Sequence, residues 1–411
     1  MDSFFLTEKD ILRVYKEEGK LKEYNYAFDY IKFRALSSTK KIKEMGHFNV
    51  KYSTLLKWKN EKRVPYGIKC LEFFKKRNLL PYYPNEFTAR IVGFLHGDGY
   101  LFDSLGSFGF VSKDKTMLLK IKKDVEGELK IKGKLKKKRD KGDIEFINNN
   151  KVIVKNPTYA LSFNCKALGH LFYKLGVPKG KKIYQEFSVP HWIMNGNKNI
   201  KKSFLQGLFD SELSNSIISS FKGHTNNLSS PRMEMSKIKH FENNLRLYLT
   251  QIKSLLKDFG INSKVAYLRK HKNRKISLTL SINNKLSNIY NFIDKLGFYY
   301  NKKRIIRALR IKKLSLEKIK NKNVLYKVLC YCKNKPSFTM QNLEQDLSIS
   351  KSFTKIIGLY LYKNKLANRR LKNRWFYYYP KLNKINKIIK NPLILETLPR
   401  IRLRYRNPTT S

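Results

Sequence analysis

The sequence predicts an α+β protein in which two similar halves are flanked by helical segments. A nine-residue helical segment at 91–99 is echoed at 205–213, and a second segment at 166–182 is echoed at 285–303. Between these landmarks, segments such as 159–163 and 275–282 alternate with period two and contain many β-branched or aromatic residues, which is typical of strands. Each half therefore runs helix, strands, helix, strands, helix.

Residues 1–85 predict a helical domain of the helix-turn-helix type. The stretch 38–65 has the rhythm of two short helices joined at Gly46. One face of the second helix is largely apolar and consists of Tyr52, Leu55, Leu56 and Trp58. Lys51 and Lys57 lie off that face, where a recognition helix would contact DNA. An ordinary amphipathic helix pair with solvated lysines fits the same pattern, and the sequence leaves that alternative open.

The boundaries of the two halves follow from the repeat. A linker is predicted by Pro81, Pro84 and the polar Asn85 and Glu86, with the first half expected at 86–195 and the second at 196–315. The interval from Gly93 to Gly207 is 114 residues and that from Gly176 to Gly297 is 121 residues. The two copies therefore differ only by a small insertion.

Small residues recur at a spacing of four in both repeated helices. Gly93 and Gly97 lie in the first helix, and Gly207 and Ser211 lie in the second. Each glycine costs a helix about 1 kcal/mol relative to alanine, so another interaction must offset the loss. Because residues four apart share one face of a helix, the missing side chains allow a second backbone to approach closely.

Packing through these faces would bring Asp98 and Glu212 together, since each follows the second small residue by one position. Both acids lie near a helix C-terminus, where the macrodipole disfavours negative charge, and they repel each other. Bound divalent cations would remove both penalties. Oxygen ligands without a Cys or His cluster favour Mg²⁺ or Mn²⁺ over zinc. The pattern predicts metal-assisted hydrolysis of a phosphodiester, with these two acids as the catalytic carboxylates.

Residues 318–380 predict three helices followed by a hairpin, as in a winged helix. Lys351 and Lys355 would begin the helix that enters a DNA groove, while Arg370 and Arg374 would lie in the wing. A helical protein-binding appendage is the alternative. The basic stretch 381–411 is expected to be a tail that either follows phosphates or remains disordered.

The charge balance predicts a nucleic-acid partner. Lys and Arg total 87 against 31 Asp and Glu, a formal net charge of +56, while 41% of the residues are hydrophobic. This is the composition of a folded basic protein, whose positive field suits a polyanion. A/T-rich codons account for part of the Lys content, but they do not explain why acids are so few.

Other classes of protein are disfavoured. The four cysteines show neither a paired zinc pattern nor the density of a disulfide-stapled secreted domain, so we expect them to be reduced, buried and inert. No uninterrupted apolar stretch approaches the length of a membrane span, and no membrane partner is expected. We expect an intracellular, cytoplasmic protein, with an organellar location left open.

The two repeated segments, IVGFLHGDG and LQGLFDSEL, resemble the nine-residue motif of the LAGLIDADG homing endonucleases. The resemblance covers roughly 87–315. It implies a free-standing, single-chain monomer whose two pseudo-symmetric αββαββα halves form a saddle on double-stranded DNA. It also implies that the penultimate acids of the motifs, Asp98 and Glu212, bind the metal and serve one strand each.

The same resemblance implies further site residues. Backbone carbonyls of Gly97 and Ser211 would be metal ligands, and each half would place a basic residue near the scissile phosphate, for which Lys182 and Lys303 are the candidates. Strands that follow each motif would read bases in the major groove. The polar residues singled out there as DNA contacts are Ser112, Lys113, His224, Asn226 and Arg232.

Two positions depart from the family pattern. His96 stands where the family often has its first Asp, a position that is mostly structural, and Leu213 stands where it usually has Gly. A leucine in a left-handed helix-ending geometry costs roughly 1 kcal/mol or more, so we expect the second motif helix to end differently. Impaired cleavage of one strand would then leave a nickase or a DNA binder.

Two further functions fit the same sequence. One is a DNA-binding regulator that uses this scaffold without cutting, although such regulators lose the acids that both motifs retain here. The other is an RNA maturase that helps a group I intron to fold and contacts structured intron RNA by shape and phosphates. Metal-dependent strand cleavage distinguishes the endonuclease from both.

Overall fold

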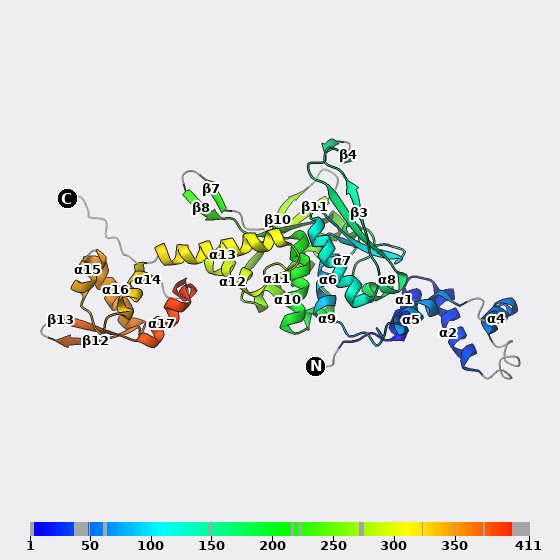
Figure 1. Ribbon diagram of the computed structural model, residues 1–411, viewed down its shortest axis with the longest axis horizontal. Coiled ribbons are helices and arrows are strands. Elements are labelled where there is room, and N and C mark those ends of the chain that lie inside the picture. Colours follow the sequence, from blue (N-terminus) through cyan, green and yellow to red (C-terminus); the bar gives the residue numbers. More distant parts are fainter. Residues whose placement is uncertain are drawn as a thin grey trace. The chain divides into compact units, whose positions relative to one another are not determined.

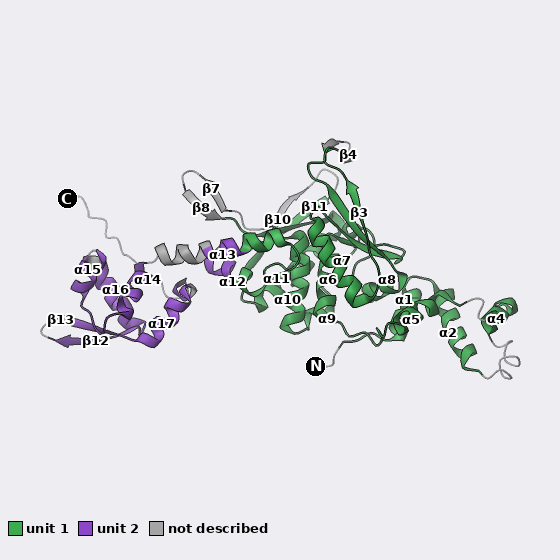
Figure 2. Cartoon of the chain, viewed as in Figure 1, with its two compact units in different colours: residues 1–284, 291–308 green, residues 285–290, 309–411 purple. Residues whose placement is uncertain are grey.

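The computed structural model describes residues 4–36, 48, 50–60, 64–147, 150–214, 218–221, 224–270, 275–322, 324–349, 351–372 and 375–396. It is a mixed helix-and-sheet protein with two compact units (Figures 1 and 2). Unit 1 comprises residues 1–284 and 291–308, and unit 2 comprises residues 285–290 and 309–411. Each unit is described by itself.

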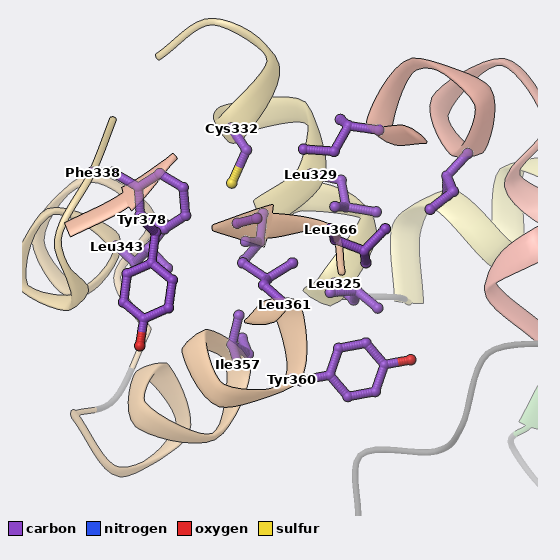
Figure 3. Packing of buried hydrophobic residues seen from close by; sticks show 14 of the residues in the cluster. Leu325, Leu329, Cys332, Phe338, Leu343, Ile357, Tyr360, Leu361, Leu366 and Tyr378 are labelled. Atoms are coloured by element: carbon purple, nitrogen blue, oxygen red, sulfur yellow. The ribbon is translucent and has the colours of Figure 1, made fainter. Parts of the chain in front are cut away.

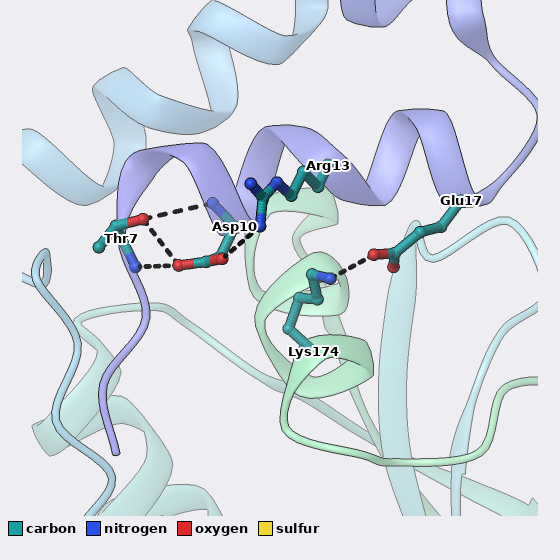
Figure 4. Close-up of polar contacts among 5 residues, drawn as sticks. All are labelled: Thr7, Asp10, Arg13, Glu17 and Lys174. Carbon is teal, nitrogen blue, oxygen red and sulfur yellow. Dashed lines mark hydrogen bonds and ion pairs between the residues drawn. The ribbon is translucent and has the colours of Figure 1, made fainter. Parts of the chain in front are cut away.

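Unit 1 begins with the helices α1 (Glu8–Glu17), α2 (Leu21–Ala35), α4 (Tyr52–Lys59) and α5 (Tyr66–Lys75). Thr7 starts α1 with a capping box, because its side chain accepts the Asp10 N–H while the Asp10 carboxylate accepts the Thr7 N–H (Figure 4). An ion pair between Glu17 and Lys174 ties α1 to the first half of the repeat. These helices therefore pack against the repeat and form one unit with it.

The proposed recognition helix is α4, but its predicted apolar face is only half correct. Leu55 and Trp58 are buried, whereas Tyr52 is 63% exposed and Leu56 is 37% exposed. The preceding helix and its turn at Gly46 lie outside the described residues. The helix α4 is therefore present and buries two side chains. A DNA-recognition helix and an ordinary amphipathic helix would both do this, so the two alternatives stay open.

The first half of the repeat follows the predicted order of elements. They are α6 (Glu86–His96), β1 (Gly99–Leu101), β2 (Ser107–Ser112), α7 (Lys115–Leu129), β3 (Lys134–Arg139), β4 (Ile144–Ile147), β5 (Asn150–Ile153), β6 (Thr158–Asn164) and α8 (Lys166–Lys174). The strands β1, β2, β6 and β3 form an antiparallel sheet in that order, and β4 with β5 forms a separate hairpin. Phe108 on β2 pairs with Phe163 on β6, and both are fully buried in the core.

The second half repeats this order. Its elements are α10 (Lys198–Glu212), β7 (Ile218–Phe221), β8 (His224–Leu228), β9 (Arg232–Ile238), α11 (Glu242–Asp258), β10 (Ser263–Lys270), β11 (Lys275–Ile282) and α12 (Leu286–Lys295). The sheet order β10-β11-β9 matches β3-β6-β2 of the first half. The connection between the halves carries the turn η2 (Lys182–Tyr184) and the short helix α9 (His191–Met194).

The motif helices α6 and α10 pack side by side through their small residues (Figure 1). A β-carbon on Gly93 would lie 2.1 Å from the Phe204 carbonyl oxygen, and one on Gly207 would lie 1.9 Å from the Arg90 carbonyl oxygen. These distances are far below van der Waals contact. The prediction of a close backbone approach at the glycines is therefore confirmed.

Two expectations from the sequence concern the ends of these helices, one at Leu213 after α10 and one at Asn85 before α6. Leu213 has φ −80° and ψ 126°, an extended conformation that costs a leucine nothing, and its side chain is fully buried. The second motif helix therefore ends without the left-handed geometry, as expected. Asn85, which we placed in a linker, instead caps α6 through a capping box with Thr88.

Unit 2 contains the predicted three helices and hairpin. They are α14 (Val324–Lys333), α15 (Met340–Leu347), α16 (Lys351–Lys363), β12 (Ala367–Lys372) and β13 (Trp375–Pro380). Its apolar core includes Leu329, Phe338, Ile357 and Tyr378 (Figure 3). The helix α13 (Lys302–Lys322) leads from residues of unit 1 into this unit.

The expectation of a tail from residue 381 onward is wrong for its first part. Residues 382–396 form the helix α17 (Leu382–Lys390) and the turn η4 (Pro392–Glu396). Ile385, Ile388 and Leu395 are buried in the core of unit 2. This segment is therefore part of the folded unit, and residues 397–411 lie outside the described residues.

Two further expectations concern the whole chain. The four cysteines are free thiols, but only Cys70 and Cys332 are buried, whereas Cys165 and Cys330 are half-buried. Among the helices that the structure describes, none combines the length and the apolar character needed to cross a membrane.

Candidate functional site

The crossing of α6 and α10 brings the ends of the two motifs into contact. A β-carbon on Gly97 would lie 2.0 Å from the Ser211 hydroxyl oxygen and 2.8 Å from Cγ of Glu212. The side chain of Glu212 therefore packs across Gly97, next to Asp98. Asp98 is exposed in a hollow whose other lining residues include Lys113, Ser211, Lys303 and Arg304. The two predicted acids, 114 positions apart, share one site.

Lys182 closes this site on the side of the first motif. Its ammonium group donates hydrogen bonds to the Gly97 carbonyl and, at 2.7 Å, to the Gly99 carbonyl. Lys182 belongs to η2, which follows α8 after the Leu175–Gly176 turn. Lys182 therefore contacts the backbone on both sides of Asp98, and its predicted position near a scissile phosphate stays a prediction.

Arg304 has the corresponding place beside the second motif. Its guanidinium donates hydrogen bonds to the carbonyls of Phe209 at 2.6 Å, Asp210 at 3.0 Å and Ser211 at 3.3 Å. The Phe209 carbonyl also accepts the Leu213 N–H, whereas the carbonyls of Asp210 and Ser211 are acceptors at the end of α10 that a forked donor can satisfy together. The predicted residue, Lys303, also lines the hollow. The hydrogen bonds to the motif backbone, however, come from Arg304.

The charges of the site perturb one another. Burial raises the pKa of Glu212, and the neighbouring Asp98 carboxylate raises it further, against the opposing effect of Lys182 and Arg304. Asp98 remains accessible, yet surrounding protein atoms desolvate its carboxylate and raise its pKa, while Lys182 and Arg304 lower it. Burial lowers the pKa of Lys182 to about 8, although both acids oppose this shift. Two acids and two bases that perturb one another's pKa in this way are typical of a functional site.

His96 and Asp210 occupy the same position in the two motifs, and each holds the turn that follows the last helix of its own half. His96 is fully buried, and its Nε2 donates to the Gly176 carbonyl at 3.1 Å. Asp210 accepts N–H groups from Tyr299 and Tyr300 at 3.1 and 2.6 Å. The first turn offers a carbonyl and the second offers N–H groups, which explains why the two residues differ. The expected structural role of His96 is consistent with this arrangement.

Burial keeps the His96 imidazole neutral. It lowers the pKa of His96 to about 3, and the nearby Lys182 lowers it as well. With Nε2–H donated to a carbonyl, Nδ1 is left as an acceptor for the Tyr248 hydroxyl, 3.3 Å away. His96 is thus a satisfied core residue and not a second base of the site.

The donor chemistry of the hollow suits a hard divalent cation. Asp98 and Glu212 supply carboxylate oxygens, and the carbonyls of Gly97 and Ser211 lie beside them. Each of these carbonyls already accepts a hydrogen bond, from Lys182 or Arg304, but retains a second lone pair. The described residues contain no group of three or more His, Cys, Asp or Glu side chains positioned to hold a metal ion. Any ion here would therefore depend on these two acids, with water and substrate oxygens completing its coordination.

No family model matches the chain. Over 248 residues it is 29% identical to the tRNA-splicing ligase RtcB of Methanopyrus kandleri, covering 58% of this chain and 24% of that protein. Over 205 residues it is 31% identical to the RNA polymerase subunit Rpo1N of Methanocaldococcus jannaschii, covering 49% of this chain and 15% of that protein. The replication factor C small subunit of the same organism is 27% identical over 329 residues, covering 75% of this chain and 17% of that protein. The chain spans about a quarter of these relatives or less.

Among solved structures, a variant of the homing endonuclease I-DmoI matches 55% of this chain and 97% of its own, with 16% identity and a TM-score of 0.34. Full-length WhiA from Thermatoga maritima matches 78% of this chain and 95% of its own, with 13% identity and a TM-score of 0.30. Likenesses of this strength do not establish a shared fold or a shared activity.

The predicted base-reading residues lie in varied settings. Ser112 uses its hydroxyl to accept the Asp114 N–H at 3.1 Å, so it helps to start α7. Lys113 lines the hollow with Asp98, and Arg232 is exposed at the start of β9. His224 and Asn226 belong to β8, but their side chains lie outside the described residues.

The predicted contacts in the flanking segments belong to α4 of unit 1 and to unit 2. Lys51 and Lys57 are exposed at α4. In unit 2, Lys351 is exposed at the start of α16 and Lys355 is exposed one turn later. Arg370 is exposed on β12, and Arg374 lies outside the described residues. All of these assignments as DNA contacts stay predictions.

Proposed function

We propose that the chain is a site-specific, double-strand DNA endonuclease of the LAGLIDADG homing type. The observation that carries the proposal is the crossing at Gly93 and Gly207, which brings Glu212 next to Asp98, with Lys182 and Arg304 bonded to the backbone at the two motif ends. Burial and the Asp98 carboxylate both raise the pKa of Glu212, and burial raises the pKa of Asp98, so the pair has no evident benefit for stability. A pair retained against that cost is best explained by chemistry that needs it.

The proposed roles follow from these positions. Asp98 and Glu212 would hold Mg²⁺ or Mn²⁺, one acid for each DNA strand. The bound ions would activate water and stabilise the leaving oxygen of the phosphodiester. Lys182 and Arg304 would offset charge that develops on the phosphate, because each lies at the end of one motif. Since its pKa is about 8, Lys182 stays mainly protonated at pH 7 and can donate to a phosphate oxygen.

The sheets supply a surface for DNA. In the first sheet, one cross-strand row on the face opposite the buried phenylalanines consists of Tyr100, Gly109, Ser162 and Lys134. Lys134 and Lys136 are exposed on the edge strand β3. The Tyr100 ring lies over the buried Gly109, and the exposed lysines at the edge of this face are the groups that can contact DNA phosphates.

The sequence relatives favour a segment that inserts into other genes over a ligase or a polymerase. The matched stretch accounts for 24%, 15% and 17% of three proteins with different named activities. Parts of this chain therefore resemble parts of proteins with three different named activities, and no one of those activities is favoured for this chain. A stretch that recurs inside proteins of unrelated activity is what an element that spreads by cutting DNA would leave.

A non-cleaving DNA-binding regulator is the second candidate. The observation that favours it is the occupation of the Gly97 and Ser211 carbonyls by Lys182 and Arg304, which places cations where the resemblance implies metal ligation. Incubation of the purified chain with a randomised plasmid library and Mg²⁺ tests the choice. Linear product that disappears with EDTA supports the endonuclease. Tight, site-specific binding without any strand break supports the regulator.

A further inference from the structure

The hairpin of unit 2 has one open face. Ala367 and Tyr378 are buried on its inner face, where Tyr378 packs over Gly358 of α16. Side chains alternate across a strand, so the residues between these positions point the other way. We call this opposite side the outer face, and its described side chains are Asn368, Arg370, Lys372, Tyr377 and Tyr379. All of them are exposed except Tyr377, which is half-buried.

The cross-strand register groups aromatic and basic side chains on this face. Arg370 pairs directly with Tyr377, and Asn368 pairs with Tyr379. The Arg370 guanidinium also lies 5.8 Å from the Tyr379 ring centroid, the diagonal contact expected of neighbours on one face. Tyrosine rings and a guanidinium are all planar groups on which another flat group can stack.

The segment that contains the outer face carries charge of one sign. Between residues 351 and 380 the sequence contains eight Lys or Arg, eight aromatic residues and no Asp or Glu. This segment has no acidic residues, and its Lys and Arg residues are interspersed with aromatic ones. Such a surface complements a polyanion that carries flat groups. Nucleic acid has both properties.

Paired and unpaired nucleic acid would use such a surface differently. In a duplex the flat faces of the bases are stacked inside the helix, and only base edges and phosphates are accessible in the grooves. Rings on the face of a sheet stack on base faces, which are available only in single strands, loops or unpaired ends. A basic residue such as Lys372 would meet the phosphates of the same strand.

We propose that the outer face of the β12–β13 hairpin binds unpaired nucleotides by stacking their bases on Tyr377 and Tyr379. Arg370 and Lys372 contact the phosphates that connect those bases. This binding is distinct from the cleavage of double-stranded DNA proposed for unit 1, and it requires neither Asp98 nor a metal ion.

Fluorescence anisotropy of the full-length chain with a short, labelled pyrimidine single strand tests the proposal. EDTA is present throughout, so cleavage cannot contribute. The single strand is supplied as DNA and, separately, as RNA, and the duplex form of the DNA is measured alongside. The combined variant Tyr377→Ala, Tyr379→Ala is expected to weaken single-strand binding by about tenfold or more, because each lost stack is worth about 1–3 kcal/mol.

Two variants provide matched controls. Tyr362→Ala removes a tyrosine that is 45% exposed on α16, compared with 36% for Tyr379, and should leave single-strand binding unchanged. Tyr379→Phe keeps the ring and should also bind as the unmodified chain does. The proposal is supported whether the chain prefers DNA, prefers RNA or binds both single strands equally, provided that the combined variant loses this binding. An equal loss of duplex binding, or the same loss in Tyr362→Ala, overturns the proposal.

Discussion

Gly93 and Gly207 lie against each other's helices in the same way, each with its Cα facing a carbonyl oxygen of the opposite backbone. A β-carbon on either one would lie within 2.1 Å of that oxygen. This reciprocal contact sets the spacing of α6 and α10. It consequently sets how Asp98 and Glu212 meet.

Alanine at either glycine is expected to separate the motif helices. The added methyl group has no space, and overpacking of this kind costs about 1–3 kcal/mol of stability. Chemical denaturation of Gly93→Ala and Gly207→Ala measures the loss. Gly127→Ala in α7 is the matched control, because a β-carbon there meets nothing within 4 Å. It should stabilise the chain by up to about 1 kcal/mol, since alanine favours the helix.

Arg304 should matter more for cleavage than Lys303. Arg304→Gln removes the donors to three carbonyls at the end of α10, whereas Lys303→Gln removes only a charge from the lining of the hollow. Loss of an electrostatic contact at a reacting phosphate typically costs about a hundredfold in rate or more. Single-turnover cleavage rates of the two variants provide the comparison. Equal rates would show that Arg304 has no special role.

Arg304→Lys separates charge from geometry at the same position. Lysine keeps the positive charge but cannot fork across several carbonyls. We expect a cleavage rate between those of the unmodified chain and Arg304→Gln. A rate equal to that of the unmodified chain would mean that charge alone is required.

His170 makes unit 1 sensitive to acid. It is 1% exposed beneath Tyr15 of α1, and burial lowers its pKa from 6.5 to about 3, with Lys166 and Lys20 adding to the effect. Below pH 6.5 the unfolded chain binds a proton that the folded chain does not, so stability is fully present above pH 6.5 and falls as the pH drops toward 3. The loss at pH 5 is about 2 kcal/mol.

Urea unfolding at pH 7.5 and at pH 5 tests this assignment. His170→Phe keeps a ring against Tyr15 but cannot bind a proton. The difference in unfolding free energy between the two pH values should therefore shrink by about 2 kcal/mol in this variant. An unchanged difference would assign the acid sensitivity to other groups, such as the equally buried His96.

The sequence predicted the core of the site because its signals are local. Glycines at a spacing of four identify a helix face, and the acid one position beyond each second small residue follows from the helix geometry. Lys182 was also found, since the repeat places it six residues after Gly176. The same count from Gly297 selects Lys303, but α13 begins at Lys302 with Asn301 accepting the Arg304 N–H. That local start of the helix turns Arg304 toward the motif.

Other features could not be read from single positions. The first motif has His96 where the second has Asp210, because His96 faces a carbonyl and Asp210 faces N–H groups. Only the tertiary contacts reveal this difference. The helix at Leu382–Lys390 did have a signal, because its apolar residues recur with helical spacing. Its high lysine content led to the expectation of a tail, and burial of Ile385 and Ile388 overrides that composition.

The measurement that tests the central claim most directly is strand-resolved cleavage of a mapped target by Asp98→Asn and Glu212→Gln in the presence of Mg²⁺. If each acid serves one strand, the unmodified chain linearises the target, each single variant nicks a different strand or is inactive, and the double variant binds without cutting. Intact cleavage of both strands by the double variant would contradict the assignment of Asp98 and Glu212 as the catalytic pair.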